Sequence, residues 1–136
     1  MSSPEEQRYG ELLALALDHA RHGEAKELRL MIEHGLPVNL ANHEGNSLLM
    51  LAAYNDHAET VQMLLECGAE PDRRNDRGQT PLGGVAFKGY VNIAKLLLAA
   101  GADPLADQGM KMTPLSFATT FGRTEIKKLL EVHVPF

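Results

Sequence analysis

The chain has 136 residues, a length that fits one domain, and 44% of them are hydrophobic, which is enough for a core without disulfides or metals. Thirteen basic and eighteen acidic residues give a net charge of −5, which argues against binding nucleic acid by electrostatic attraction. Cys67 is the only cysteine, so no internal disulfide can form. No apolar run approaches the ~18 residues of a membrane span, and the first ten residues are polar and acidic, unlike a signal peptide. We therefore expect a soluble cytoplasmic protein without membrane contact.

The first predicted element is one long helix, from about Pro4 to His22. Ser3 is a good N-cap and Pro4 suits the first helical turn. Glu6 stands three residues after the cap, where its side chain can complete a capping box. Gly10 is a weak point inside this helix because glycine has a low helix propensity.

A spacing of 33 residues organises the rest of the chain. Hydroxyl residues recur at this step, and so do glycines and apolar triplets. A period kept over four units without an insertion indicates a repeat architecture. The recurring positions are Ser47, Thr80 and Thr113; Gly35, Gly68 and Gly101; Gly45 and Gly78; Gly89 and Gly122, with Gly23 and Asp56 at the earlier equivalents; and triplets that begin at Leu30, Met63 and Leu96.

The third unit shows how each unit is built. The Thr80 hydroxyl is expected to cap a short helix, Pro81 suits the first helical position, and Gly89 ends the helix in a left-handed conformation. A second helix is predicted from about Tyr90 to Ala100. Neither helix reaches the ~12 residues that are stable alone, so only stacking of consecutive units buries their faces. The residues expected on the buried side of the second helix are Ile93, Leu96, Leu97 and Leu98.

These motifs resemble the ankyrin repeat over about residues 9–133. The resemblance implies an all-α solenoid of helix-turn-helix units, with hairpin loops that project at right angles. It also implies a protein-binding scaffold that is seldom catalytic, and short stand-alone members of this kind are more typical of bacteria. The resemblance is carried by three sets of residues: Gly78-Gln79-Thr80-Pro81-Leu82 with Gly89-Tyr90 and Leu96 to Asp103; Gly45 to Leu49 with Leu64 to Ala69; and Thr113-Pro114-Leu115 with Phe121-Gly122-Arg123.

The resemblance divides a single domain, residues 1–136, into four units. Residues 4–41 lack the Thr-Pro-Leu opening and have Asp18 where the inner units are apolar, as expected of an N-terminal cap whose outer face meets water. Residues 42–74 and 75–107 are the inner units, and residues 108–136 form the C-terminal cap. Lys111 stands where the inner units have glycine, so we expect its hairpin to be altered or missing.

Two positions depart from the local rules for helices. Asp56 replaces a helix-ending glycine and costs ~1 kcal/mol relative to glycine if its conformation is left-handed. Gly83 and Gly84 stand inside a helix, where together they cost ~2 kcal/mol of helix propensity. The pair permits either tight packing between neighbouring units or a soft joint that lets the concave face adapt. The sequence leaves both alternatives open.

No catalytic or cofactor-binding motif is present, so we predict neither an enzyme nor a cofactor. His19 and His22 are three residues apart but lack a third ligand at a fixed spacing, so no metal site is predicted. His57 is expected to have a structural hydrogen-bonding role, as is common at this position of the family. Cys67 is expected to be a partly exposed, inert thiol rather than a redox sensor.

The predicted binding surface combines an aromatic strip with the hairpin tips. By resemblance, the last turns of the first helices line the concave face, and these turns carry Tyr54, Phe87 and Phe121, with Asn55 and Lys88 beside them. Aromatic side chains there suit a protein-binding hot spot. The alternative is that one or more of the rings only seals the stack between units, Phe121 above all because it is off register. The hairpin-tip candidates are His43, Glu44, Asn46, Arg74, Asp76, Arg77, Gln79, Met110 and Met112.

We therefore predict a small adaptor or inhibitor that binds another protein through its concave face and hairpin tips. The basic stretch Arg73 to Arg77 favours an acidic protein patch or a solvated loop over nucleic acid. The alternatives are a structural stabiliser or a self-associating scaffold without a dedicated partner, and an enzyme with a small-ligand pocket in the groove, which the missing motifs disfavour. We expect a monomer, with a weak dimer as the alternative.

Overall fold

The computed structural model describes residues 3–135, so Met1, Ser2 and Phe136, the last residue of the predicted C-terminal cap, lie outside the described residues. It confirms the predicted all-helical architecture, with no named strand in residues 3–135. The eight helices of the described residues are α1 (Pro4–His22), α2 (Ala25–Glu33), α3 (Leu48–Tyr54), α4 (Ala58–Glu66), α5 (Pro81–Lys88), α6 (Val91–Ala99), α7 (Pro114–Thr120) and α8 (Thr124–Val132).

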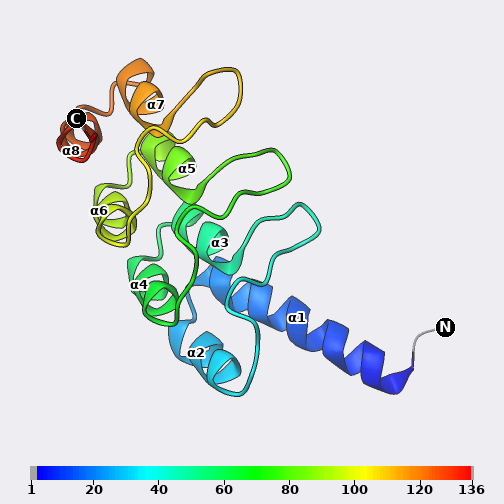
Figure 1. Cartoon of the computed structure of the whole chain (residues 1–136). Coiled ribbons are helices and arrows are strands. Elements are labelled where there is room, and N and C mark those ends of the chain that lie inside the picture. Colours follow the sequence, from blue (N-terminus) through cyan, green and yellow to red (C-terminus); the bar gives the residue numbers. More distant parts are fainter. Residues whose placement is uncertain (1–2, 136) are drawn as a thin grey trace.

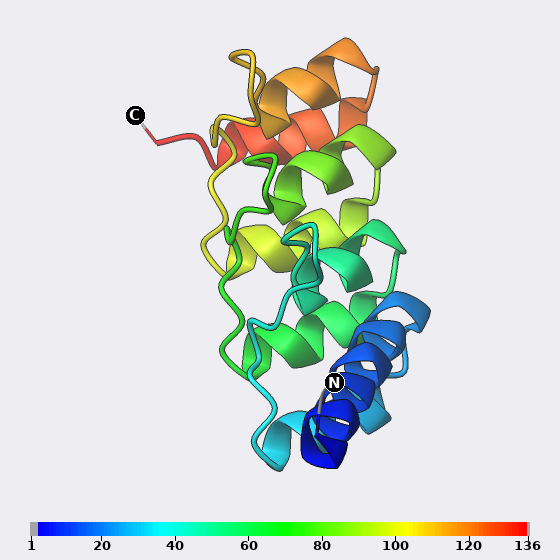
Figure 2. The same ribbon diagram turned by 90° about the vertical axis from the view of Figure 1, so that its right-hand side faces the viewer.

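The helices form two layers, with one antiparallel pair in each predicted unit (Figure 1). Helices α1, α3, α5 and α7 make one layer, and α2, α4, α6 and α8 make the other. Three hairpin loops project from the first layer on the side away from the second layer, as Figures 1 and 2 show. The core lies between the layers, where the fully buried side chains include Leu28, Leu48, Leu64, Leu82, Val85, Ile93, Leu97, Ile126 and Leu130.

Most predicted helix ends are confirmed. α1 has the predicted capping box, in which the Ser3 hydroxyl accepts from the Glu6 backbone N–H at 3.1 Å. Gly89 is left-handed with φ +82°. The helix predicted at Tyr90 to Ala100 is one residue shorter at each end, and Leu96 is only half-buried because it lies at the edge of the helix's buried side.

The predicted cap at Thr80 is wrong. The Thr80 hydroxyl accepts no bond from its own helix; instead it accepts from Gln108 Nε2 at 2.9 Å. The Gln108 Oε1 accepts from the Thr80 backbone N–H at 2.8 Å. Gln108 is almost fully buried, so a side chain from the next unit satisfies the polar groups at the start of α5.

The last hairpin is altered, as predicted from Lys111. In the first two hairpins, the side-chain oxygens of Asn42 and Asn75 each accept two backbone N–H groups of their own loop. Gln108 occupies the equivalent position but points into the stack. Gly109, Met110 and Lys111 all have positive φ, which is a strained conformation for the two residues that are not glycine.

Asp56 has the left-handed conformation that the repeat predicted, with φ +62°. Replacing it with glycine removes the steric cost of a Cβ there, so Asp56→Gly is expected to raise the free energy of unfolding by about 0.3–1 kcal/mol in urea denaturation. Asp56→Ala is the control, because it removes the same charge but keeps the Cβ, and it should not stabilise the protein. Destabilisation by Asp56→Gly would contradict the strain argument.

Candidate functional site

Four aromatic side chains surround a hollow of about 350 Å³ on the hairpin side of the first layer. They are Tyr54 from the end of α3, Phe87 from the end of α5, and Phe117 and Phe121 from α7 and its C-cap. Gly83, Gly84 and Gln108 also line it, as do Gln79 and Lys88. The hollow therefore joins predicted binding residues from three consecutive units.

The three phenylalanines form one cluster. The rings of Phe87 and Phe121 meet edge to face, with centroids 4.7 Å apart, and the Phe117 ring lies within 6.5 Å of both centroids. Phe87 and Phe121 remain 45% and 47% exposed, so the cluster presents an ordered apolar surface to solvent. Phe117 was not among the predicted binding residues, although its place one turn before Phe121 was a usable signal.

Tyr54 is held differently, because it is packed between two units. Its ring lies where a Cβ on Gly84 would be, and its hydroxyl donates to the carbonyl of Thr80 at 3.4 Å. Burial raises the pKa of Tyr54 to about 12, so the phenol stays neutral. These are the contacts of a ring that seals the stack, whereas the two exposed phenylalanines keep free surface.

The same close approach shows what surrounds the glycine pair. A Cβ on Gly84 would overlap the Tyr54 ring from the preceding unit, and a Cβ on Gly83 would overlap the Gln108 carboxamide from the next unit. Of the two alternatives, the structure shows the tight packing between neighbouring units. α5 is one continuous helix through both glycines.

One cation, Lys88, lines the hollow, and a second, Arg123, is bonded to the backbone of a lining residue. Lys88 Nζ donates to the Tyr54 carbonyl at 2.7 Å and lies 5.7 Å from the centroid of the Tyr90 ring. Arg123 Nε donates to the Phe87 carbonyl at 2.9 Å. Arg123 was not among the predicted binding residues.

The repeat spacing could have identified Arg123. It stands 66 residues after His57, which means two repeats along the chain. The His57 ring Nε2 lies 2.9 Å from the Arg21 carbonyl and bonds to it, so the predicted structural role of His57 is confirmed. His57 and Arg123 thus both connect the turn between two helices to a backbone carbonyl of the preceding unit.

The first two hairpins are bonded to each other. The Asp76 backbone N–H donates to the Glu44 carbonyl at 3.1 Å, and Asn75 Nδ2 donates to Asn46 Oδ1 and Gln79 Oε1, both at 2.9 Å. A hollow of about 160 Å³ lies between them and shares Tyr54 and Gln79 with the aromatic hollow. The polar and aromatic parts of the predicted surface therefore adjoin.

Other predicted residues divide into engaged and free side chains. Arg74 Nη1 donates to the carbonyls of Gly78 and Asp107, and so links two hairpins. Asn55 Nδ2 donates to the Leu51 carbonyl at 2.7 Å, and Met112 is half-buried. The exposed side chains at the tips are those of His43, Glu44, Arg77 and Met110, which is 97% exposed, and His43 Nε2 lies 3.8 Å from Glu44 Oε1.

The basic stretch is partly neutralised within the loops. Arg73 pairs with Glu70 at 3.1 Å, and the Arg74 guanidinium is bonded to backbone carbonyls. Arg77 is the arginine of this stretch whose side chain projects without such a contact among the described residues. The local geometry therefore offers little concentrated positive charge for nucleic acid.

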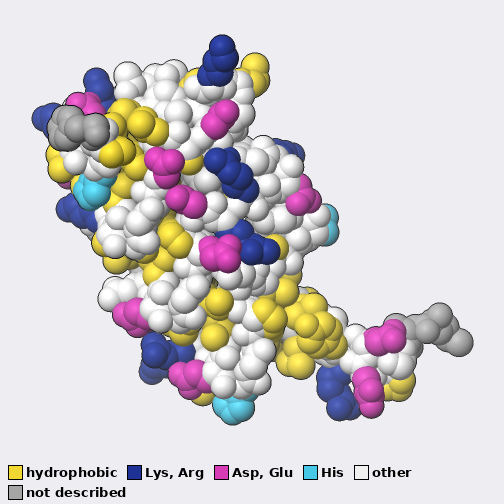
Figure 3. Space-filling model, viewed as in Figure 1, with side chains coloured by type: hydrophobic (Ala, Val, Ile, Leu, Met, Phe, Trp, Pro, Cys, Tyr) yellow, Lys and Arg dark blue, Asp and Glu magenta, His cyan; other side chains and the backbone are white. Residues whose placement is uncertain are grey.

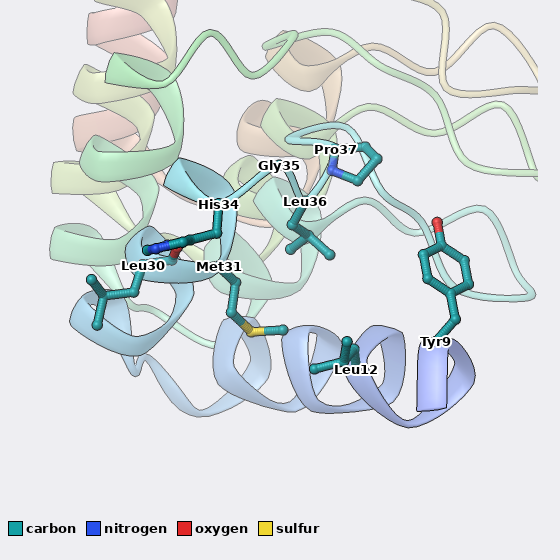
Figure 4. A pocket seen from close by; sticks show the side chains of 8 residues that line it. All are labelled: Tyr9, Leu12, Leu30, Met31, His34, Gly35, Leu36 and Pro37. Carbon is teal, nitrogen blue, oxygen red and sulfur yellow. The ribbon is translucent and has the colours of Figure 1, made fainter. Parts of the chain in front are cut away.

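A second apolar hollow, of about 510 Å³, lies at the N-terminal end (Figure 4). Met31 and Leu36 point toward α1, from which Leu12 and Tyr9 rise. It exists because α1 has 19 residues whereas α2 has nine, and hydrophobic side chains gather there in Figure 3. Its polar members are the Tyr9 hydroxyl and His34, which bonds through Nδ1 to the Leu30 carbonyl. All of its lining residues belong to the first unit, whereas the aromatic hollow joins predicted binding residues of three units.

The remaining chemical candidates have ordinary partners. His19 Nδ1 lies 3.1 Å from Glu24 Oε1, and His22 Nδ1 lies 2.9 Å from the Asp18 carbonyl. Residues 3–135 contain no group of three or more potential ligands that could hold a metal, and within them no helix is long and apolar enough to cross a membrane. Cys67 is half-buried, with its Sγ 3.8 Å from Met63 Sδ.

Comparison with known proteins extends this description. A family model described as ankyrin repeats (3 copies) matches residues 11–75 and 49–133. Over 42 residues, the chain is 52% identical to a Pseudomonas aeruginosa protein whose name describes it as an ankyrin repeat protein. That match covers 31% of this chain and 25% of the relative, so it spans about a quarter of the relative's length.

Proposed function

Since the chain belongs to the ankyrin-repeat family, whose repeats are generally protein-protein interaction modules, we propose that it is a small adaptor or inhibitor that binds one partner protein. The observation that carries this proposal is the exposed pair Phe87 and Phe121, held edge to face at 4.7 Å. Rigid aromatic side chains lose little rotamer entropy on binding, which is why they dominate binding energy at interfaces.

Different residues of this surface would contribute differently to binding. Phe87 and Phe121 supply the apolar area that a partner buries, and Lys88 and Arg123 flank it. The free tips of the hairpins supply specificity, because their side chains are exposed and varied. Tyr54 acts indirectly, since it holds the units in the alignment that builds the hollow.

Affinity capture from a lysate of the source organism, analysed by mass spectrometry, tests this function. We expect wild type to retain a protein that the Phe87→Ser/Phe121→Ser variant loses. Leu105→Ser/Val132→Ser is the matched control: it also removes two exposed apolar side chains, but away from the hollow, and it should retain the partner. Circular dichroism must show that both variants are folded.

The alternative function is a structural stabiliser or self-associating scaffold in a cytoplasmic setting. Under this alternative, no protein is captured in a way that depends on Phe87 and Phe121. The Phe87→Ser/Phe121→Ser variant would instead change the stability or the sedimentation of the purified chain. Equal capture by wild type and by the Phe87→Ser/Phe121→Ser variant would therefore overturn the proposed binding surface.

A further inference from the structure

The rim of the aromatic hollow carries positive charge on an acidic protein. The chain has a net charge of −5, yet no carboxylate lines this hollow, and its charged lining residue is Lys88. Arg123 lies next to it, since its Nε bonds to the Phe87 carbonyl and its Cδ lies 3.1 Å from the point where a Gly89 Cβ would stand. The local charge is therefore opposite to that of the whole chain.

Both cations are fixed in place but keep free donors. Lys88 uses one of its three N–H groups on the Tyr54 carbonyl, and Arg123 uses its Nε–H on the Phe87 carbonyl. Neither side chain takes part in an ion pair within residues 3–135. Cations that are already ordered lose less entropy on binding an anion, and they form the stronger, charge-assisted kind of hydrogen bond.

The hollow suits one large apolar side chain. It has a volume of about 350 Å³ and three phenylalanine rings on its walls. Apolar anchors in preformed pockets, with a few polar groups beside them, are the usual form of a binding hot spot. The arrangement therefore has two parts, an aromatic socket and a cationic rim.

We propose that the socket receives one aromatic or large aliphatic side chain of the partner protein, and that Lys88, reinforced by the nearby charge of Arg123, binds a carboxylate of the neighbouring residue. This inference rests on the proposed function and adds the chemistry of the recognised segment. The partner segment is an apolar residue adjacent to Asp or Glu. A basic residue at that place would meet two cations and be rejected.

Three blocked tetrapeptides test the proposal: acetyl-Gly-Phe-Glu-Gly-amide, its Phe-Lys analogue and its Ala-Glu analogue. Binding is followed by NMR through the backbone amide signals of Gly83, Gly84 and Gly89. We expect saturable shifts with Phe-Glu at about millimolar concentration, as is reasonable for so small a ligand. Phe-Lys should bind about tenfold more weakly, and Ala-Glu should give no saturable shift.

Charge variants make the test specific. Lys88→Gln/Arg123→Gln keeps hydrogen-bond donors but removes the charges, so Phe-Glu and Phe-Lys should bind equally. Lys88→Glu/Arg123→Glu should reverse the preference. Lys95→Glu/Lys128→Glu changes the net charge by the same amount on exposed sites of α6 and α8, and it should leave the preference unchanged.

The outcomes separate this inference from the proposed function. Equal binding of Phe-Glu and Phe-Lys to wild type, or an equal effect of the Lys95→Glu/Lys128→Glu control, would overturn the cationic rim even if capture of a partner depends on Phe87 and Phe121. Saturable binding of Ala-Glu would overturn the socket. Charge-selective peptide binding without any captured partner would support the inference and count against the adaptor function.

Discussion

Replacing Gln108 with alanine is expected to lower the free energy of unfolding by about 2–4 kcal/mol, a large effect for one loop residue. The carboxamide accepts from the Thr80 backbone N–H at 2.8 Å and donates to the Thr80 hydroxyl and the Ala106 carbonyl, both at 2.9 Å. Thr80 is fully buried, so alanine leaves its N–H without a partner at the start of α5. Urea denaturation measures the change.

Two further variants show whether the loss has this cause. Gln62→Ala removes an exposed glutamine whose amide bonds to Glu66 at 3.3 Å, and it should change the free energy of unfolding by less than about 0.5 kcal/mol. Thr80→Val removes the hydroxyl partner and should cost less when Gln108 is already alanine, because the two residues share one bond. Additive effects of Thr80→Val and Gln108→Ala would refute the proposed network.

The fold could be predicted from the sequence because the repeat carries its own local signals. Ser3 and Glu6 mark the start of α1, and the left-handed turns at Asp56 and Gly89 follow from the 33-residue spacing. These features depend on residues close together in the chain. The same logic predicted that Lys111 would alter the last hairpin.

The candidate site could be predicted only in part, because its finer contacts join different units. Gln108 stands where Asn42 and Asn75 stand, so its spacing indicates a loop-capping role, but its longer side chain reaches Thr80, 28 residues away in the chain. The space it uses exists because Gly83 has no side chain. Such a compensation between two positions can be recognised only when their contact is known.

Tyr54 and the phenylalanines illustrate the same limit on the concave face. Repeat spacing placed Tyr54 and Phe87 at equivalent positions, and that placement is confirmed for the ends of α3 and α5. Their surroundings differ because the next helix carries Gly84 beside Tyr54 but Phe117 beside Phe87. Equivalent positions thus give a packed ring in one unit and an exposed ring in the next.

Gly84→Ala tests this difference, because two physical effects oppose each other there. Helix propensity favours alanine over glycine by about 1 kcal/mol. The added Cβ would overlap the Tyr54 ring, and overpacking of this kind costs about 1–3 kcal/mol. The overlap outweighs the propensity gain, so we expect a net loss of up to about 2 kcal/mol in the free energy of unfolding. Gly10→Ala is the control: no atom lies within 4 Å of its added Cβ, so it should stabilise the protein by about 0.5–1 kcal/mol.

The sign of the effect at Gly84 should depend on Tyr54. When Tyr54 is alanine, the obstructing ring is gone and only helix propensity remains, so Gly84→Ala should become stabilising. A soft joint makes a different prediction: alanine would slow hydrogen exchange of the α5 amides by the same factor whether or not Tyr54 is present. If Gly84→Ala changes the free energy of unfolding equally with Tyr54 and with alanine at position 54, the ring does not determine the effect. That result would favour the soft joint over tight packing.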